Sequence, residues 1–272
     1  MKKLNFGCGT KVASGWNNID FLSNDSRVQR VNLLAGFPFP DNHFDAVYSS
    51  HVLEHFTRAQ GLALICEGRR VLKPGGILRV VLPDLEGSCR EYLRVLALDD
   101  NDPKKKDMYQ WIVIELLDQL VRVQASGEMG PFARDAVASG NQPLISYIRA
   151  RTESKFDDSI SEGRSSFSAK LKKLTPQKLM TKSVDWYLNL VGFLLPKNLR
   201  QMVMVRTTLG ERHRWMYDQH GLRLLLQEAG FSDCRFFLFN QSDIPQFNED
   251  CLDCHDDGSS YKNNSIYAEA RK

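Results

Sequence analysis

The stretch "LNFGCGT", residues 4–10, places two glycines directly after a short apolar run. Glycine tolerates a positive φ angle and lets a ligand approach the backbone closely. A strand that breaks at Gly7 and Gly9 therefore predicts a ligand-binding turn. The turn falls short of the G-x-G-x-x-G dinucleotide fingerprint, because Ser14-Gly15-Trp16 arrives late and no helical pattern follows it.

An acid follows the next β-rich run. Asp20 comes soon after Gly9, whereas a nicotinamide-binding fold has its acid about 20 residues further on. The short spacing leaves little room for a first helix, whose N-terminus would otherwise bind a pyrophosphate. This disfavours NAD and favours a ligand with a ribose, held by Asp20, and a small zwitterionic tail.

The first part of the chain and its end alternate β-rich runs with helical ones, which predicts a parallel sheet with crossover helices. Thr57 is expected to cap a helix that Pro74-Gly75-Gly76 ends, and Asp218 to cap another that Gly230 ends. Strands are expected at Lys3–Phe6, Asn17–Phe21, Val28–Leu34, Phe44–Ser50, Gly76–Pro83, Cys234–Phe239 and Ser265–Ala270.

Between Glu91 and Gly210 this alternation is lost. Helical runs such as Met108–Gln124 alternate there with stretches rich in Ser, Gly and Lys. We expect residues 1–90 and 211–272 to form the core of the fold, and residues 91–210 to form a helical insertion that supplies the substrate pocket. Disorder is expected at Ser154–Ser168.

The composition is that of a globular protein: 272 residues, 42% hydrophobic, 25% charged and a net charge of +3. The basic start lacks a long apolar continuation, and the apolar run Trp186–Leu195 is shorter than the roughly 20 residues of a spanning helix. We therefore expect a cytoplasmic protein with reduced cysteines. Residues 164–200 are strongly basic, which suggests contact with an anionic membrane or a solvated face.

Two short motifs match metal or cofactor patterns. His51-Val52-Leu53-Glu54-His55 has the H-x-x-E-H spacing of a class of zinc peptidases, which needs both histidines on one helix face and a third ligand. The preceding β-rich run and the Thr57 cap argue against such a helix, so zinc hydrolysis is a remote alternative and no metal is expected. Residues 251–255, "CLDCH", match a haem-attachment pattern but are expected to form a polar loop.

Five segments, taken in order, resemble the class I S-adenosylmethionine-dependent methyltransferases. The likeness is greatest to a bacterial branch with a Gly-Cys-Gly turn and a GW-N-x-D segment. The segments are "LNFGCGT", "GWNNID", "FPFPDNHFDAVYSSHVLEHF" (residues 37–56), "VLKPGGILRVVLPDLEG" (residues 71–87) and "HRWMYDQHGLRLLLQEAGF" (residues 213–231). The resemblance implies a Rossmann-like, doubly wound, mostly parallel seven-stranded sheet, with the helical insertion between strand 5 and the last helix.

It also implies that S-adenosylmethionine is the cofactor. Gly7, Cys8 and Gly9 would wrap its methionine part, and Asp20 would hold the ribose diol. Asn32 would accept a hydrogen bond from the adenine amino group, or alternatively serve a structural turn. The expected cofactor set is completed by Phe6, Leu33 and Ser50.

Methyl transfer from a sulfonium mainly requires the acceptor to lie in line with the S–CH3 bond, about 3 Å from the methyl carbon. A hydroxyl acceptor also needs a base. His51 is the first candidate by position and His213 the second, although either can be a packing histidine. Asp84 could orient the acceptor or the base, or cap the following helix.

The acceptor is expected to bind to the insertion. Glu115, Asp118, Gln119 and Arg122 recur at helical spacing and could bind a polyhydroxylated substrate, or form an exposed helix face with an Asp118–Arg122 pair. We expect a small molecule or saccharide as acceptor. The alternatives are a nucleic acid, disfavoured by the modest charge, and a cofactor-binding partner protein without catalysis.

Overall fold

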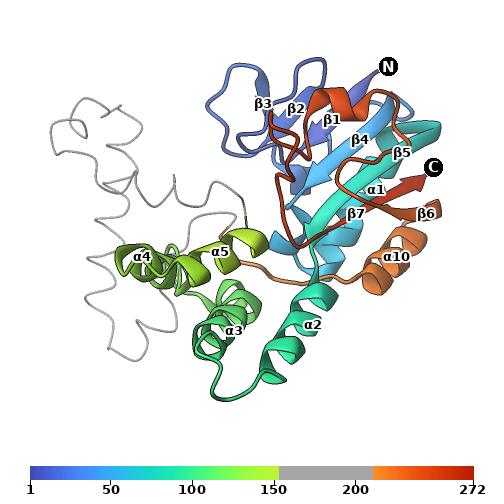
Figure 1. Ribbon diagram of the computed structural model, residues 1–272. Coiled ribbons are helices and arrows are strands. Elements are labelled where there is room, and N and C mark those ends of the chain that lie inside the picture. Colours follow the sequence, from blue (N-terminus) through green and yellow to red (C-terminus); the bar gives the residue numbers. More distant parts are fainter. Residues whose placement is uncertain (153–210) are drawn as a thin grey trace, which may run out of the picture.

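The computed structural model describes residues 1–152 and 211–272 and centres on a seven-stranded sheet of order β3-β2-β1-β4-β5-β7-β6 (Figure 1). The pairs among β1 to β5 are parallel, and β7 runs antiparallel to both of its neighbours. This confirms the predicted Rossmann-like, mostly parallel sheet. The strands are β1 (Lys3–Phe6), β2 (Asn17–Asp20), β3 (Val28–Arg30), β4 (Phe44–Ser50), β5 (Leu72–Pro83), β6 (Ser232–Phe237) and β7 (Ser265–Arg271).

Three predicted strands have boundaries that are wrong by two residues or more, namely β3, β5 and β6. β6 lies at Ser232–Phe237 instead of Cys234–Phe239. β3 ends early because the Asn32 side chain accepts a hydrogen bond from the Leu34 amide (3.1 Å) and begins the 3-10 helix η1 (Leu33–Ala35). β5 starts at Leu72, immediately after the helix, so Pro74-Gly75-Gly76 lies within the strand instead of ending the helix. A register shift between Phe44 and Ala46 accommodates these extra residues against β4.

Both predicted helix caps are present. Thr57 and Gln60 form a reciprocal capping box at the start of α1 (Arg58–Val71). Asp218 accepts from the Gly221 amide (2.6 Å) at the start of α10 (Gln219–Glu228). Gly230 follows α10 with a φ of 85°, the left-handed conformation expected of a glycine stop.

The helices α1 and α10 cover one face of the sheet. The two-residue alternation of β4 and β5 directs Val47 and Val80 toward this face, where they meet Leu64 of α1 and Leu226 of α10 in one buried apolar cluster. Each such side chain stabilises the fold by about 1.5–3 kcal/mol when fully buried.

The opposite face is covered by extended segments in the described part of the chain. As the short Gly9-to-Asp20 spacing predicted, no helix forms between β1 and β2. Trp16 from that connection and Phe247 from the 3-10 helix η4 (Phe247–Asp250) pack around Tyr48 of β4, with ring centroids 6.0 and 5.5 Å from the tyrosine ring.

A buried ion network anchors the segment between β6 and β7 to this face. Arg79 of β5 is fully buried; its Nε lies 2.7 Å from Asp253 Oδ2 and its Nη1 lies 2.7 Å from Glu269 Oε1. Tyr48 donates a hydrogen bond to Asp253 as well. The network therefore holds residues 251–255, the "CLDCH" loop, against the sheet.

Four further helices gather beside the sheet (Figure 1). They are α2 (Leu85–Leu96), α3 (Lys105–Val121), α4 (Met129–Ala138) and α5 (Gln142–Arg151). The last three have their own apolar cluster around the fully buried Trp111. The predicted domain boundary at residue 91 falls inside α2, and the division into domains stays a prediction.

Predictions for Ser154–Ser168 and for residues 164–200 concern segments outside the described residues. Within residues 1–152 and 211–272, no helix combines the length and the apolar character that crossing a membrane requires.

Candidate functional site

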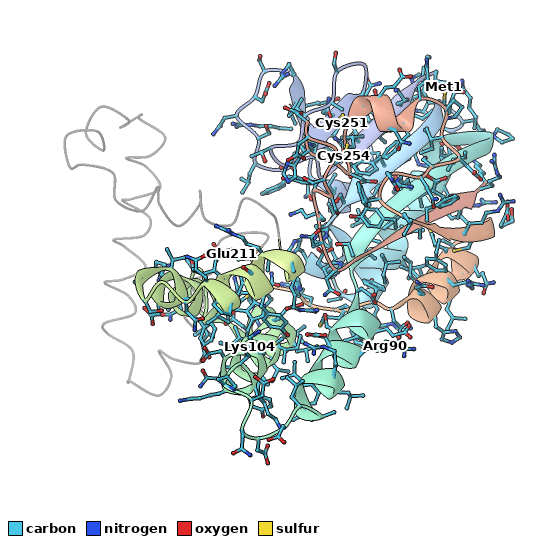
Figure 2. All side chains as sticks on the ribbon, viewed as in Figure 1. Met1, Arg90, Lys104, Glu211, Cys251 and Cys254 are labelled. Carbon is cyan, nitrogen blue, oxygen red and sulfur yellow. The ribbon has the colours of Figure 1, made fainter. Side chains whose placement is uncertain are left out.

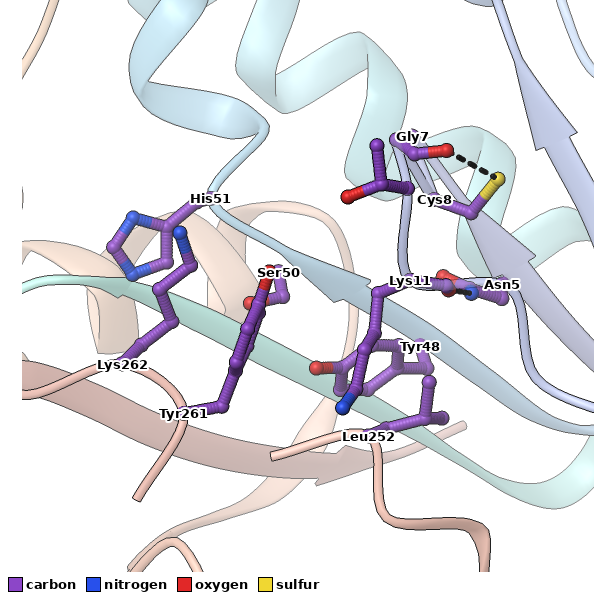
Figure 3. A pocket seen from close by; sticks show the side chains of 12 residues that line it. Asn5, Gly7, Cys8, Lys11, Tyr48, Ser50, His51, Leu252, Tyr261 and Lys262 are labelled. Atoms are coloured by element: carbon purple, nitrogen blue, oxygen red, sulfur yellow. Dashed lines mark hydrogen bonds between the residues drawn. The ribbon is translucent and has the colours of Figure 1, made fainter. Parts of the chain in front are cut away.

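A first cavity of about 300 Å³ opens where the strand order reverses, at the carboxyl ends of β1 and β4 (Figure 3). Open α/β sheets bind ligands at this position. One wall is the turn after β1, with Gly7, Cys8 and Lys11, and the other is the loop before β7, with Tyr261 and Lys262.

The two glycines of the turn are required for different reasons. Gly7 has a φ of 66°, and a Cβ there would lie 2.4 Å from Val52 Cγ2. Gly9 has a φ of 51°, and no atom of the described residues lies within 4 Å of where its Cβ would be. The backbone of Gly9 is therefore open toward the cavity, as the close approach of a ligand demands.

Asp20 ends β2 beside this turn. Its Oδ2 accepts from the Gly9 amide (2.9 Å) and its Oδ1 from the Leu22 amide (2.9 Å). A carboxylate oxygen can accept more than one hydrogen bond, so Asp20 keeps acceptor capacity for a ribose. It lies next to the cavity but not in its lining.

The other predicted cofactor residues divide into two groups. Cys8 and Ser50 line the first cavity, whereas Phe6 and Leu33 are buried in the apolar core and Asn32 caps η1, outside the lining. Burial, aided by the negative charge of Asp20, raises the pKa of the Cys8 thiol to about 12. Cys8 is therefore protonated at neutral pH and is not a nucleophile.

A second cavity of about 180 Å³ lies between the sheet and the helices α3 to α5. Glu115 and Gln119 line it, as does Arg151, which forms two hydrogen bonds of 2.6 Å to the Glu115 carboxylate. Asn264 donates to Glu115 Oε1 as well (3.1 Å). The cavity thus offers a set of fixed polar groups.

The predicted polar face of α3 is divided between this cavity and the interior. Asp118 and Arg122 pair with each other, but both are buried, and Asp118 also accepts from the Glu128 amide (2.7 Å). The alternative of an exposed helix face is therefore wrong, because residues 122–128 fold back over this part of α3 and cover it.

His51 lines both cavities. Its Nε2 lies 3.0 Å from Ser265 Oγ and its Nδ1 lies 3.4 Å from Glu54 Oε1. Burial, together with the positive charge of Lys262, holds the pKa of His51 well below 6.5, so the ring is neutral. Because its two ring nitrogens face Ser265 and Glu54, His51 is a poor general base in this conformation.

The structure agrees that no α-helix spans the H-x-x-E-H motif; Leu53–His55 form the short 3-10 helix η2. The fold nonetheless brings Glu54 and His55 next to His213, so that one ligand atom from each lies within 4.8 Å of the others. Desolvation raises the pKa of Glu54 to about 8 and lowers that of His213 to about 3.

Lys262 also lines both cavities, and sequence reasoning missed it. Desolvation, opposed by the charge of Glu54, lowers its pKa to about 8. Figure 3 shows its ammonium group beside the His51 ring. No pattern in the polar loop around Lys262 indicates this placement, because it depends on β7 pairing with β5.

Asp84 occupies the position before α2, but its side chain makes no capping hydrogen bond and lines neither cavity. Its Oδ1 is buried without a hydrogen-bond partner in the described residues, and desolvation raises the pKa of the carboxyl group. The backbone of Asp84 joins Asn264 and Tyr217 to the start of α2.

The "CLDCH" loop forms part of the wall of the first cavity through Leu252. Lys11 donates to the Cys254 carbonyl oxygen (3.0 Å), which ties the loop to the glycine turn. Cys251 and Cys254 lie together in this loop as free thiols (Figure 2), and burial and the neighbouring Cys251 raise the pKa of Cys254 to about 11. The loop thus has the position of a cover over the cavity.

Comparison with known proteins gives matches to methyltransferases. Residues 4–80 match the family model described as a methyltransferase domain. Sterol 24-C-methyltransferase of Pneumocystis carinii is 28% identical over 151 residues, which are 46% of this chain and 36% of that protein. Probable methyltransferase ltbC of Aspergillus luteorubrus is 48% identical over 48 residues, 17% of each chain.

The chain spans about a third or less of the length of the curated relatives that it matches. A solved SAM-dependent methyltransferase from Methanosarcina mazei covers 100% of this chain, and this chain covers 92% of it, at 13% identity and a TM-score of 0.41. An identity of 13% and a TM-score of 0.41 are too low to support an argument about the function of this chain. The family match and the sequence matches show that residues 4–80 are similar to a methyltransferase domain.

Proposed function

We propose that this chain transfers the methyl group of S-adenosylmethionine, bound in the first cavity, to a hydroxyl group of a small polar molecule bound in the second. The observation that carries this proposal is that His51 and Lys262 line both cavities. A methyl donor in one cavity and an acceptor in the other would meet at these two side chains, which is the alignment that methyl transfer requires.

The residues of the first cavity fit the cofactor. The open backbone at Gly9 suits the close approach of its methionine part, and Asp20 has free acceptor capacity for its ribose. Lys11, whose ammonium lies between the Cys254 carbonyl and the Tyr261 ring, is near enough to the turn to bind the cofactor's carboxylate.

Lys262 is the stronger candidate for the base. When a hydroxyl oxygen bonds to the methyl carbon, the S–CH3 bond breaks and the hydroxyl proton must pass to an acceptor. A lysine with a pKa of about 8 is unprotonated in about a tenth of molecules at pH 7. His51, whose ring nitrogens face Ser265 and Glu54, would position the acceptor.

The lining of the second cavity supports a polyhydroxylated acceptor such as a saccharide. Glu115, Arg151 and Asn264 hold one another in place and present donors and acceptors for hydroxyl groups. The sterol substrate named for two of the relatives fits such a polar lining less well.

Calorimetry with S-adenosylmethionine and measurement of the demethylated cofactor released with different acceptors test the proposal. The acceptor panel should contain saccharides, a sterol and single-stranded RNA. We expect cofactor binding, and turnover with a saccharide. Turnover with the sterol or RNA alone would overturn the acceptor class, and binding without any turnover would favour a cofactor-binding partner protein. Absence of cofactor binding would overturn the whole assignment.

A further inference from the structure

Glu54 is a buried carboxyl group whose oxygens have no hydrogen-bond partner among the described residues. It is 1% exposed, and His51 Nδ1 lies 3.4 Å from its Oε1, which is longer than an ordinary hydrogen bond. Buried carboxyl groups are nearly always paired, hydrogen-bonded or coordinated to a metal, since an unpartnered one is costly. The position of Glu54 therefore indicates a binding partner that residues 1–152 and 211–272 do not supply.

Two histidines lie in position to share such a partner. One ligand atom each from Glu54, His55 and His213 fall within 4.8 Å of one another, and the two imidazole centroids are 5.2 Å apart. Tetrahedral coordination with bonds of about 2.1 Å places ligand atoms about 3.4 Å apart. Small side-chain rotations would therefore bring all three onto one cation.

The hydrogen bond of His55 favours a metal-binding tautomer. Its Nδ1 lies 3.0 Å from the Arg212 carbonyl oxygen and donates to it in the neutral ring. The Nε2 atom then carries the lone pair. Metal-ligating histidines commonly have their other ring nitrogen held by a carbonyl or carboxylate in this way.

Backbone hydrogen bonds fix the two segments that carry these residues. The Arg214 amide donates to the Glu54 carbonyl (2.6 Å), and the His213 amide donates to the Gln119 carbonyl (2.9 Å). The three side chains are thus held together by η2 and by the segment that leads into α10. A site whose ligands are held by such contacts before binding loses little entropy when the cation enters.

We propose that Glu54, His55 and His213 bind one divalent transition-metal ion of the zinc class. Two imidazoles and one carboxylate are a common ligand set for such ions and leave a further position for water or substrate. His213 also lines the second cavity, which gives the ion a route to the site. The proposal replaces His51 of the H-x-x-E-H pattern by His213 and does not depend on methyl transfer.

The direct test is metal content and binding by the full chain. After treatment with a chelator and a check of folding by circular dichroism, the protein is titrated with CoCl2 or ZnCl2. We expect one ion per chain by elemental analysis, a visible Co2+ absorption band typical of mixed nitrogen and oxygen ligands, and a Tm raised by several °C, as for any ligand that binds only the folded state. A folded protein that binds no ion would overturn the proposal.

Variants identify the ligands. His55→Gln can still donate to the Arg212 carbonyl but lacks the Nε2 ligand, and both it and His213→Gln should bind Co2+ at least about 100-fold more weakly. His51→Gln and His220→Gln, the latter on the exposed side of α10, should bind normally. Loss of binding in His51→Gln with normal binding in His213→Gln would overturn the assignment. Cofactor calorimetry on the chelated protein reports on the proposed function separately.

Discussion

His51 and Lys262 stand side by side at the place where the two cavities meet (Figure 3). His51 directly follows β4 and has a φ of 53°, a left-handed conformation uncommon for a residue other than glycine. Lys262 lies in the loop before β7. Such conformations persist when the surrounding structure holds them, and they concentrate at functional sites. The pair therefore marks the expected place of reaction.

Replacement of the Lys262 ammonium should lower turnover far more than it changes cofactor affinity. Lys262→Met lacks the base and should lower kcat by about 100- to 10,000-fold, the usual contribution of a general base. In the unmodified protein, the base must be deprotonated, so kcat should rise with pH and level off above the lysine pKa of about 8. A steady-state pH profile checks this. Lys106→Met, on an exposed position of α3, is the matched control, and an unchanged profile in Lys262→Met would contradict the role.

Removal of the Asp20 carboxylate should weaken cofactor binding. Asp20→Ala leaves the Gly9 and Leu22 amides and the proposed ribose hydroxyls without their acceptor. The loss of binding free energy should be about 1–3 kcal/mol, which raises Kd roughly 5- to 150-fold. Isothermal calorimetry with S-adenosylmethionine measures it. Asp41→Ala, which removes an exposed carboxylate paired with Arg70, should bind the cofactor normally. Equal affinities in the two variants would remove Asp20 from the site.

The two glycines of the turn should respond differently to alanine. Gly7→Ala combines left-handed strain with a Cβ 2.4 Å from Val52, so it should lower the free energy of unfolding by about 2–4 kcal/mol. The methyl group of Gly9→Ala meets no neighbour among the described residues, so this change should cost only about 1 kcal/mol of folding free energy. The methyl group projects into the space near the cavity and should reduce cofactor affinity. Urea unfolding and calorimetry separate the two effects. Similar unfolding curves for both variants would mean that the contact with Val52 is relieved by other movements.

Loss of the buried Arg79 guanidinium group in the sheet should strongly destabilise the fold. Arg79→Met leaves Asp253 and Glu269 buried without their counter-charge, and should lower the free energy of unfolding by about 3–5 kcal/mol. Arg90→Met removes an exposed partner of Glu86 and should change stability by less than about 0.5 kcal/mol. Denaturant titration compares them. Because Asp253 lies in the loop that covers the first cavity, Arg79→Met should also weaken cofactor binding.

Local sequence patterns predicted the elements that local chemistry controls. The glycine pair after β1 takes positive φ angles, Thr57 and Asp218 cap their helices, and the short connection to Asp20 forms no helix. In each case the deciding interactions lie within a few residues along the chain. The errors at Leu34 and Pro74-Gly75-Gly76 arose where a side-chain cap or a register shift changed the outcome.

Which side chains come together at the candidate site depended on contacts between residues far apart in the sequence. His213 was predicted as a possible base, but its proximity to Glu54 and His55 follows from the bonds of the Arg214 and Trp215 amides to the Glu54 carbonyl. Asp118 and Arg122 are buried and paired instead of exposed because another segment packs over α3. No spacing in one helix reveals which of its polar faces another segment will cover.

The amino-acid sequence by itself determined the alternating sheet, the glycine turn at Gly7 and Gly9 and the acid that follows it, because periodicity, glycine conformation and capping act over short distances. Only the tertiary structure brought Lys262 beside His51, and His213 beside Glu54. The strands β4, β5 and β7 had to pair before Lys262 could meet His51, and the Arg214 and Trp215 amides had to bond to the Glu54 carbonyl before His213 could meet Glu54. The resulting burial shifts the pKa values of Lys262 and Glu54.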